Sequence, residues 1–233
     1  MIYKWINKNN ASLNLDMLQW LMVSCGFSCS LLAARIFITG DMTYLFLLWN
    51  LFLAFVPFAI TRWLTSKTGF AKHKVKAAAT LFVWLLFIPN SFYILTDLFH
   101  LDKFDSAPQW FDLLLIFSFA WNGIVLGIIS LRRAEILLET VTGRRISTVI
   151  IFSVMWLNAF GIYIGRYLRF NSWDIITQPL SLFSAIFEVW LHPFRNKMEW
   201  GMIALYAVFM TVLYFTLKKL GENFSSHHQK KIK

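Results

Sequence analysis

The stretch AAATLFVWLLFIPNSFYILTDLFH, residues 77–100, decides the fold, because Asp97 is the only charged residue among its 24 positions. A helix of about 20 apolar residues crosses a hydrocarbon core about 30 Å thick. Apolar runs of similar length lie on both sides of this one in the sequence. We therefore predict an all-α integral membrane bundle of six spanning helices, at residues 17–38, 42–62, 77–100, 110–131, 147–168 and 200–217.

The composition indicates that the bilayer, rather than water, is the solvent of this chain. Apolar residues make up 58% of the sequence, charged residues 15%, and the mean hydropathy is +0.58. A soluble domain of 233 residues could not bury so much apolar surface. The net charge of +10 lies in short connections between apolar runs. It therefore predicts attraction to anionic lipid headgroups on the cytoplasmic side of the lipid bilayer, and no binding to nucleic acid.

The distribution of basic residues predicts the orientation of the chain. Cytoplasmic connections of membrane proteins keep most of the Lys and Arg residues. Sixteen of the 22 basic residues fall on the side that also carries both termini. Residues 1–16 and the basic tail 218–233 are therefore expected in the cytoplasm, with residues 17–217 forming a single transmembrane domain. The tail is polar and basic from about residue 222, and we expect that part to be disordered.

The last outer connection contains a short apolar segment, residues 180–191, between Pro179 and Pro193. The segment is too short to span a bilayer. Polar residues recur at helical spacing along one face, and apolar residues occupy the opposite face. This pattern is typical of an interfacial helix, which we expect to lie on the outer leaflet.

Polar residues in the span 77–100 form the first part of a candidate site. Pro89 interrupts the helix and frees backbone groups, which Asn90 is placed to satisfy. Spacings of three, four and three residues put four polar side chains on one helical stripe, namely Asn90, Tyr93, Asp97 and His100. Ionisable groups are costly inside a span, so the stripe predicts a polar neighbour on another helix.

The outer end of the span 147–168 forms the second part. Gly161 and Gly165 make a GxxxG face, which permits close approach of a partner helix. Four polar residues follow, namely Arg166, Arg169, Asn171 and Asp174. The three-residue spacing of the two arginines places both on one side of a helix. Since this end lies at the depth of Asp97 and His100, we expect the two segments to meet in a pocket that opens outward.

Two interpretations of this polar cluster are open. In the functional one, Asp97 and His100 act as an acid/base pair or as metal ligands, and the arginines bind a phosphate or carboxylate on a lipid-like substrate. In the structural one, Asp97 and Arg166 form an ion pair, and the other groups hydrogen bond across helices. A D-x-x-H pair without a third ligand is a weak metal motif. We therefore predict no metal site and no cofactor, and leave open whether the protein is an enzyme.

Two other functions are compatible with the sequence. Asn50, Asn122 and Asn158 lie near the middles of three spans. They would line the midplane site of a carrier, although interhelical hydrogen bonds are the commoner use of such residues. An accessory protein would instead bind other membrane proteins through the GxxxG face and the interfacial helix.

Three stretches resemble the signature segments of a known family, namely WNLFLAFVP at 49–57, LFIPNSFYILTDLFHL at 86–101 and GIYIGRYLRFNSWD at 161–174. They are similar to the bacterial multi-pass membrane proteins labelled domain of unknown function 1361. Judged by the placement of these motifs, the resemblance covers about residues 25–215. It implies a location in the bacterial cytoplasmic membrane and supplies no activity.

Overall fold

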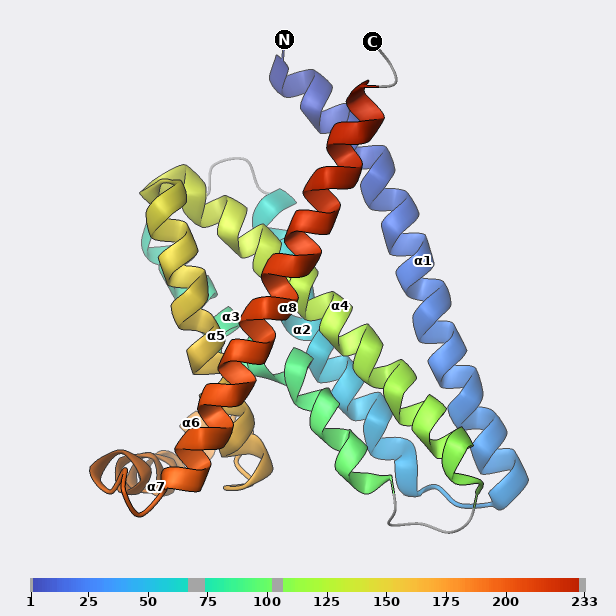
Figure 1. Ribbon diagram of the computed structural model, residues 1–233, viewed down its shortest axis with the longest axis vertical. Coiled ribbons are helices and arrows are strands. Elements are labelled where there is room, and N and C mark those ends of the chain that lie inside the picture. The colour runs from blue at the N-terminus through green and yellow to red at the C-terminus, as the bar shows by residue number, and fades with distance from the viewer. Residues whose placement is uncertain (1, 67–73, 102–106, 231–233) are drawn as a thin grey trace.

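Helices account for nearly all of the structure (Figure 1). The computed structural model describes residues 2–66, 74–101 and 107–230, and there is no strand within those ranges. The helices are, in chain order, α1 (Ile2–Thr39), η1 (Thr43–Leu45), α2 (Phe46–Ser66), α3 (Lys74–Tyr93), η3 (Ile94–His100), α4 (Gln109–Thr142), α5 (Arg144–Arg166), α6 (Asp174–Thr177), α7 (Pro179–Leu191) and α8 (Lys197–Lys230).

Six segments are long and apolar enough to cross a membrane, which confirms the predicted number. These candidate spans are Met17–Thr39, Thr43–Ser66, Val75–His100, Gln109–Thr142, Arg144–Arg166 and Lys197–Asn223. The start of α1 and the end of α8 lie at the same end of the bundle (Figure 1), as an even number of spans requires. We call this the proximal end, and the opposite end, which carries α6 and α7, the distal end.

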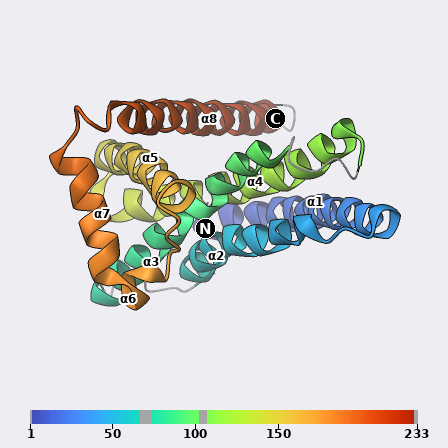
Figure 2. The same ribbon diagram turned by 90° about the horizontal axis from the view of Figure 1, so that it is seen from below.

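The fourth span, α4, is the centre of the bundle. It packs against α1, α2, α3 and α5, while α8 packs mainly against α5 (Figure 2). Glycine brings α4 close to α3, because a Cβ on Gly123 would lie only 2.8 Å from the carbonyl oxygen of Ser91. Small residues at such a crossing let two helix backbones approach without side chains between them.

A buried ion pair joins α1 to α4 in the distal half. Nε and Nη2 of Arg35 donate to the two carboxylate oxygens of Asp112 at 2.7 and 3.2 Å. The guanidinium also lies 4.4 Å from the centre of the Tyr44 ring and 3.4 Å from the Asp41 carboxylate. The side chains of Arg35 and Asp112 are 0% and 1% exposed. Each therefore provides the opposite charge that the other needs in a medium of low dielectric constant.

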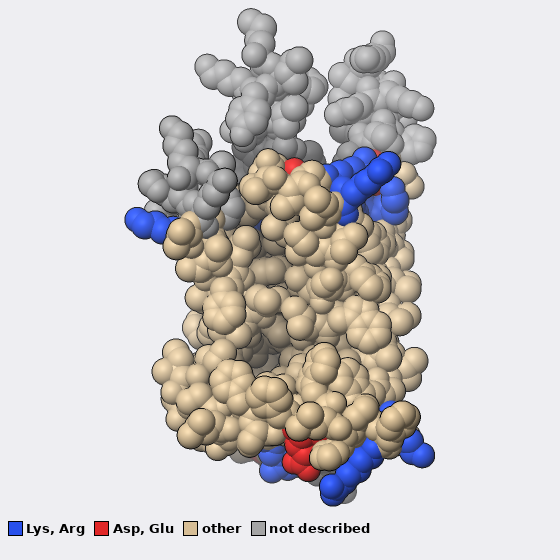
Figure 3. Space-filling model, turned by 90° about the vertical axis from the view of Figure 1, so that its left-hand side faces the viewer, with Lys and Arg blue, Asp and Glu red and all other residues tan. Residues whose placement is uncertain are grey.

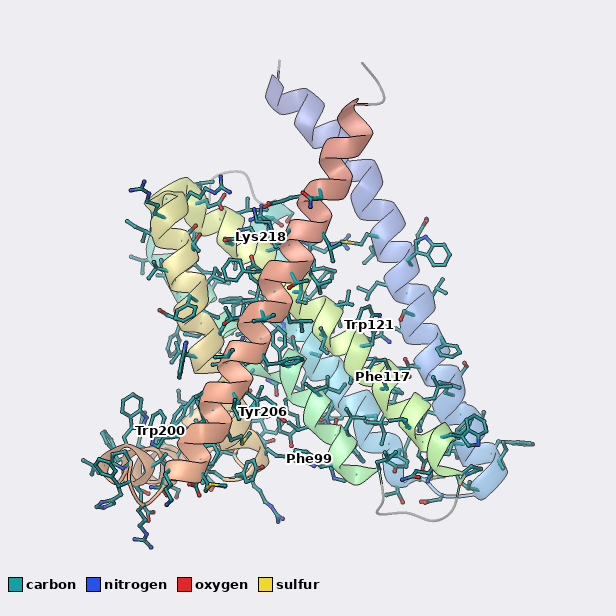
Figure 4. The ribbon with its side chains drawn as sticks, in the orientation of Figure 1. Phe99, Phe117, Trp121, Trp200, Tyr206 and Lys218 are labelled. Carbon is teal, nitrogen blue, oxygen red and sulfur yellow. The ribbon has the colours of Figure 1, made fainter. Side chains whose placement is uncertain are left out.

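A second ionic network explains why α4 continues to Thr142, past the predicted end at 131. Glu135 is fully buried and accepts hydrogen bonds from the Lys218 ammonium at 2.7 and 2.8 Å and from the Tyr214 hydroxyl at 2.6 Å. Arg132 lies 2.5 Å from the same carboxylate. Figure 4 shows Lys218 where α8 crosses α4. Because these charges pair with one another, they lie in packed helices rather than in a solvated connection.

Two further helix bounds differ from the prediction. α8 continues to Lys230 rather than ending at 217, and it includes residues 222–230, in the part of the tail that we expected to be disordered. The pairing of Lys218 with Glu135 extends the packed part of α8 beyond the apolar run that set the predicted end. At the other terminus, α1 begins at Ile2 rather than at 17, because polar residues can continue a helix that an apolar segment has started.

The GxxxG face of α5 packs inside the chain. A Cβ on Gly161 would lie 2.7 Å from the Pro89 ring, and a Cβ on Gly165 would lie 3.2 Å from the Tyr93 ring. The two glycines therefore let α3 and α5 touch at the point where α3 contains its proline. α3 is thus the neighbour of the face that the sequence offers to a partner helix.

The short helix α7 lies across the direction of the spans at the distal end (Figures 1 and 2). It begins at Pro179, a residue suited to the first turn of a helix. Trp190 fixes it to α5 and α8, since its ring centre lies 6.1 Å from that of Phe160 and 5.2 Å from that of Trp200. The separate short helix predicted at 180–191 is therefore present.

Candidate functional site

The break in α3 is held by polar side chains at the distal end. The amide of Asn90 donates to the Phe87 carbonyl at 3.0 Å and to the Ser172 hydroxyl at 2.9 Å. Ser172 in turn donates to the Leu86 carbonyl at 3.0 Å. Asn90 thus bonds to the backbone near Pro89, as the sequence suggests. The contribution of Ser172, 82 residues further along the chain, has no local sequence signal.

The predicted polar stripe of residues 90–100 is divided into two parts. α3 ends at Tyr93, and the chain continues as the 3₁₀ helix η3 from Ile94 to His100. A 3₁₀ helix has about 3.0 residues per turn instead of 3.6, so the direction of successive side chains changes at this junction. Asn90 and Tyr93 line a cavity, whereas Asp97 points into the contact of η3 with α2 and α5.

Asp97 is the centre of the polar contacts on η3. Its side chain is 1% exposed. Nδ2 of Asn50, on α2, donates to one carboxylate oxygen at 2.7 Å. Nη1 of Arg166, the last residue of α5, lies 3.7 Å from the other. Asp97 therefore connects three helices, and its ion pair with Arg166 is the one considered in the structural interpretation.

His100 extends this group toward the distal surface. Its Nδ1 lies 3.2 Å from Nη2 of Arg166 and also 3.2 Å from the backbone carbonyl of Asp97. In neutral histidine this nitrogen either accepts from the guanidinium or donates to the carbonyl, so the tautomer decides which bond forms. Arg166 also lies 5.5 Å from the centre of the Phe99 ring, which Figure 4 shows toward the distal end. The Arg166 guanidinium thus lies close to Asp97, His100 and Phe99.

The residues after α5 form a separate turn. α5 ends at Arg166, and Arg169 adopts a positive φ of 60°, so the two arginines do not share a helix face. Asp174 accepts hydrogen bonds from the backbone N–H of Asn171 at 2.6 Å and from the Thr177 hydroxyl at 2.7 Å. These two bonds hold the pKa of Asp174 below its usual range. Arg169 is exposed and forms no ion pair with any residue that the structure describes.

A cavity of about 320 Å³ lies beside the Asp97 group, between α2, α3 and α5, with α6 and α7 completing its wall. Figure 3 shows a hollow in the apolar band on this side of the molecule. Most of the lining is apolar, and includes Leu53, Leu86, Leu157, Ile164, Phe183 and Ile186. Five polar residues also line it, namely Asn50, Asn90, Tyr93, Asn171 and Ser172.

Asn50 connects the cavity with the buried ion pair. It lines the cavity and at the same time donates to Asp97. The sequence identifies Asn50 only as a mid-helix polar residue, because it lies 47 positions from Asp97 and no local pattern reveals their contact. The apolar lining on α5 and α7 is also absent from the predicted site, since such residues have no distinguishing pattern in an apolar chain.

The three mid-span asparagines do not share a site. Asn122 donates to Ser24 and Ser28 of α1, at 3.2 and 2.9 Å, and so joins α1 to α4. The amide of Asn158 is fully buried, without a hydrogen-bond partner among the described residues. Only Asn50 of the three lines the cavity. Within residues 17–66, 75–101 and 107–223, whose side chains the structure describes, no three His, Cys, Asp or Glu residues are grouped as metal ligands would be.

Comparison with known proteins identifies a family. A family model with the description "Protein of unknown function (DUF1361)" matches residues 49–213. The matched segment contains Asn50, Asp97, Arg166 and the whole lining of the cavity. No curated protein and no solved structure matches the chain. Because the match covers more than half of the 233 residues, the chain belongs to the DUF1361 family of proteins of unknown function.

Proposed function

We propose that the protein binds a lipid in the distal cavity, with a hydrocarbon chain between α5 and α7 and the headgroup near Asn50, Asn90 and Asn171. The observation that carries this proposal is an apolar cavity of about 320 Å³ with polar side chains along part of its wall. Small-molecule sites in proteins typically have about 300–1,000 Å³ and a few polar groups that fix orientation. One hydrocarbon chain with a small headgroup suits this size.

The polar groups of the lining favour an uncharged headgroup with hydroxyl groups. Asparagine amides and a serine hydroxyl both donate and accept hydrogen bonds. The nearby cation, Arg166, lies against Asp97 at 3.7 Å and does not line the cavity. An anionic headgroup would have to compete with that carboxylate, whereas a hydroxyl-bearing headgroup would not. The lining thus favours a lipid-like ligand with an uncharged headgroup over an anionic small molecule.

The distribution of charge supports an orientation for this site. The basic residues of the connections lie mainly at the proximal end, as the positive-inside pattern requires of a cytoplasmic face. The cavity then opens at the outer leaflet of the bacterial cytoplasmic membrane, and both termini lie in the cytoplasm. A reporter enzyme that is active only in the cytoplasm should therefore be active when it is fused to the C-terminus.

The geometry favours binding over the other functions. The carboxylate of Asp97 is buried and does not line the cavity, so it does not face a lipid as an acid or base would. Asn122 and Asn158 lie away from the lining, so no midplane site joins the three asparagines. Gly161 and Gly165 pack against Pro89 and Tyr93 of α3 within the chain, so α3 already uses the close approach that they allow. Lipid binding uses the cavity that these alternatives leave unexplained.

Filling the cavity is expected to weaken lipid binding strongly. Ile164→Trp places a large side chain in the lining, whereas Leu205→Trp makes a similar change on α8, where Leu205 is 72% exposed and outside the cavity. Native mass spectrometry of the purified chain titrated with monoolein measures occupancy. We expect one saturable molecule on the wild type and on Leu205→Trp, and at least about tenfold weaker binding to Ile164→Trp, equivalent to about 1.4 kcal/mol. Equal binding to the two tryptophan variants would contradict the proposal.

A further inference from the structure

A second polar feature lies at the proximal end, between α2 and α4. The guanidinium of Arg133, on α4, lies 4.6 Å from the centre of the Phe58 ring on α2. Its Nη1 is buried and has no hydrogen-bond partner in the described part of the chain. Arg62 follows Phe58 by four positions on α2, so it lies one turn nearer the proximal end on the same face. Arg133 is close enough to Arg62 for their two positive charges to interact.

The nearby carboxylates are engaged elsewhere. Glu135 accepts hydrogen bonds from Lys218, Tyr214 and Arg132. Glu139 and Glu222 lie 3.8 and 3.9 Å from Arg132. Across residues 17–66, 75–101 and 107–223, whose side chains the structure describes, Arg133 forms no ion pair. The sequence between α2 and α3 adds Lys67 and Lys72 and no acidic residue. Among the residues whose side chains the structure describes, the positive charge at this point therefore lacks a counterion.

The chemistry of the site indicates what anion would complete it. Two guanidinium groups offer several N–H donors in planar forks, which suit the oxygens of a phosphate group. Trp63, next to Arg62, is 50% exposed, as expected for a residue at the level of lipid headgroups. Basic pockets between spanning helices on the cytoplasmic side are known sites for the headgroups of anionic lipids. Phosphate from a lipid is therefore in reach of both arginines.

We propose that Arg133 and Arg62 bind the phosphate of an anionic phospholipid between α2 and α4. The Phe58 ring contacts the Arg133 guanidinium through its face. The lipid phosphate supplies the missing acceptor for Nη1 of Arg133. The headgroup would hold the proximal ends of α2 and α4 together. This site is independent of the distal cavity and does not rest on the function proposed for it.

The test measures binding of short-chain phosphatidylglycerol to the full chain in a neutral detergent, by native mass spectrometry. Arg133→Gln removes the charge at the site, and Arg144→Gln removes a proximal charge at the start of α5, away from the site. We expect about tenfold weaker phosphatidylglycerol binding for Arg133→Gln, because a hydrogen bond to a charged group is lost. We expect Arg144→Gln to bind phosphatidylglycerol as the wild type does. Arg133→Gln should bind monoolein as the wild type does.

Three results would overturn this assignment. One is unchanged phosphatidylglycerol binding in Arg133→Gln. Another is an equal loss in Arg144→Gln, which would indicate diffuse attraction to the basic surface. The third is equal binding of short-chain phosphatidylcholine, or displacement of the lipid by millimolar inorganic phosphate, which would make the ligand something other than an anionic lipid. If Arg133→Gln does not fold, Arg62→Gln decides in the same way, because Arg62 is exposed and its loss leaves packing intact.

Discussion

Arg35→Met is expected to destabilise the protein by about 3–5 kcal/mol, the range for removing one partner of a buried ion pair. The substitution keeps an unbranched apolar side chain but leaves Asp112, which is 1% exposed, without the guanidinium that donates to both of its oxygens. The attachment of α1 to α4 at the distal end should loosen first. Unfolding in sodium dodecyl sulfate, followed by tryptophan fluorescence, measures the change.

A paired substitution separates the ion pair from simple packing. Arg35→Met combined with Asp112→Leu removes both charges, and we expect the double variant to regain most of the lost stability. Arg195→Met is the matched control, since Arg195 is exposed at the distal end and forms no ion pair among the described residues. A double variant as unstable as the sum of the single variants would show that the pair does not stabilise the fold as described.

Asp97→Asn is expected to weaken monoolein binding at least about tenfold, corresponding to about 1.4 kcal/mol. The change keeps the shape of the side chain but removes the negative charge that holds Arg166, and it leaves only one, uncharged, acceptor oxygen for Asn50. The contact that fixes Asn50 in the cavity wall then becomes weaker, because a hydrogen bond to a neutral amide is weaker than one to a carboxylate. Arg166→Lys should act in the same direction, because an ammonium cannot reproduce the fork of the guanidinium.

Abundance in the membrane distinguishes a binding site from a structural pair. For Asp97→Asn and Arg166→Lys, we expect membrane levels within about twofold of the wild type, because each variant keeps a polar side chain of similar length and Arg166, at 15% exposed, can reach the distal surface. Loss of abundance together with unchanged lipid binding per folded molecule would instead assign Asp97 and Arg166 a purely structural role. Asn171→Ala, in the turn held by Asp174, provides a cavity substitution outside the ion pair.

The number of spans and the short helix α7 follow from the sequence because they depend on local properties. Apolar runs of sufficient length and the prolines at 179 and 193 are visible without any knowledge of tertiary contacts. Helix ends are less visible where charges pair across helices. Glu135 and Lys218 are 83 residues apart, and their contact keeps charged residues within packed helices beyond the ends that hydropathy indicates.

The candidate site is predictable only in part, for a similar reason. Sequence spacing brings Asp97, His100 and Arg166 to one end of the bundle, and the structure places them in contact. The sequence does not reveal that the helix changes to a 3₁₀ helix after Tyr93. This change separates the cavity-lining residues from Asp97. Nor does the sequence reveal that α5 ends at Arg166, so that Arg169 turns away.

The central claim is that a lipid chain occupies the cavity between α5 and α7. Photolabelling of the protein in vesicles tests it directly, using a monoacylglycerol that carries a diazirine in its chain at low mole fraction. We predict that mass spectrometry will find saturable labelling at Leu157, Phe183 and Ile186, displaced by excess monoolein. Labelling concentrated instead on exposed residues such as Leu205 of α8, and not displaced by monoolein, would contradict the account.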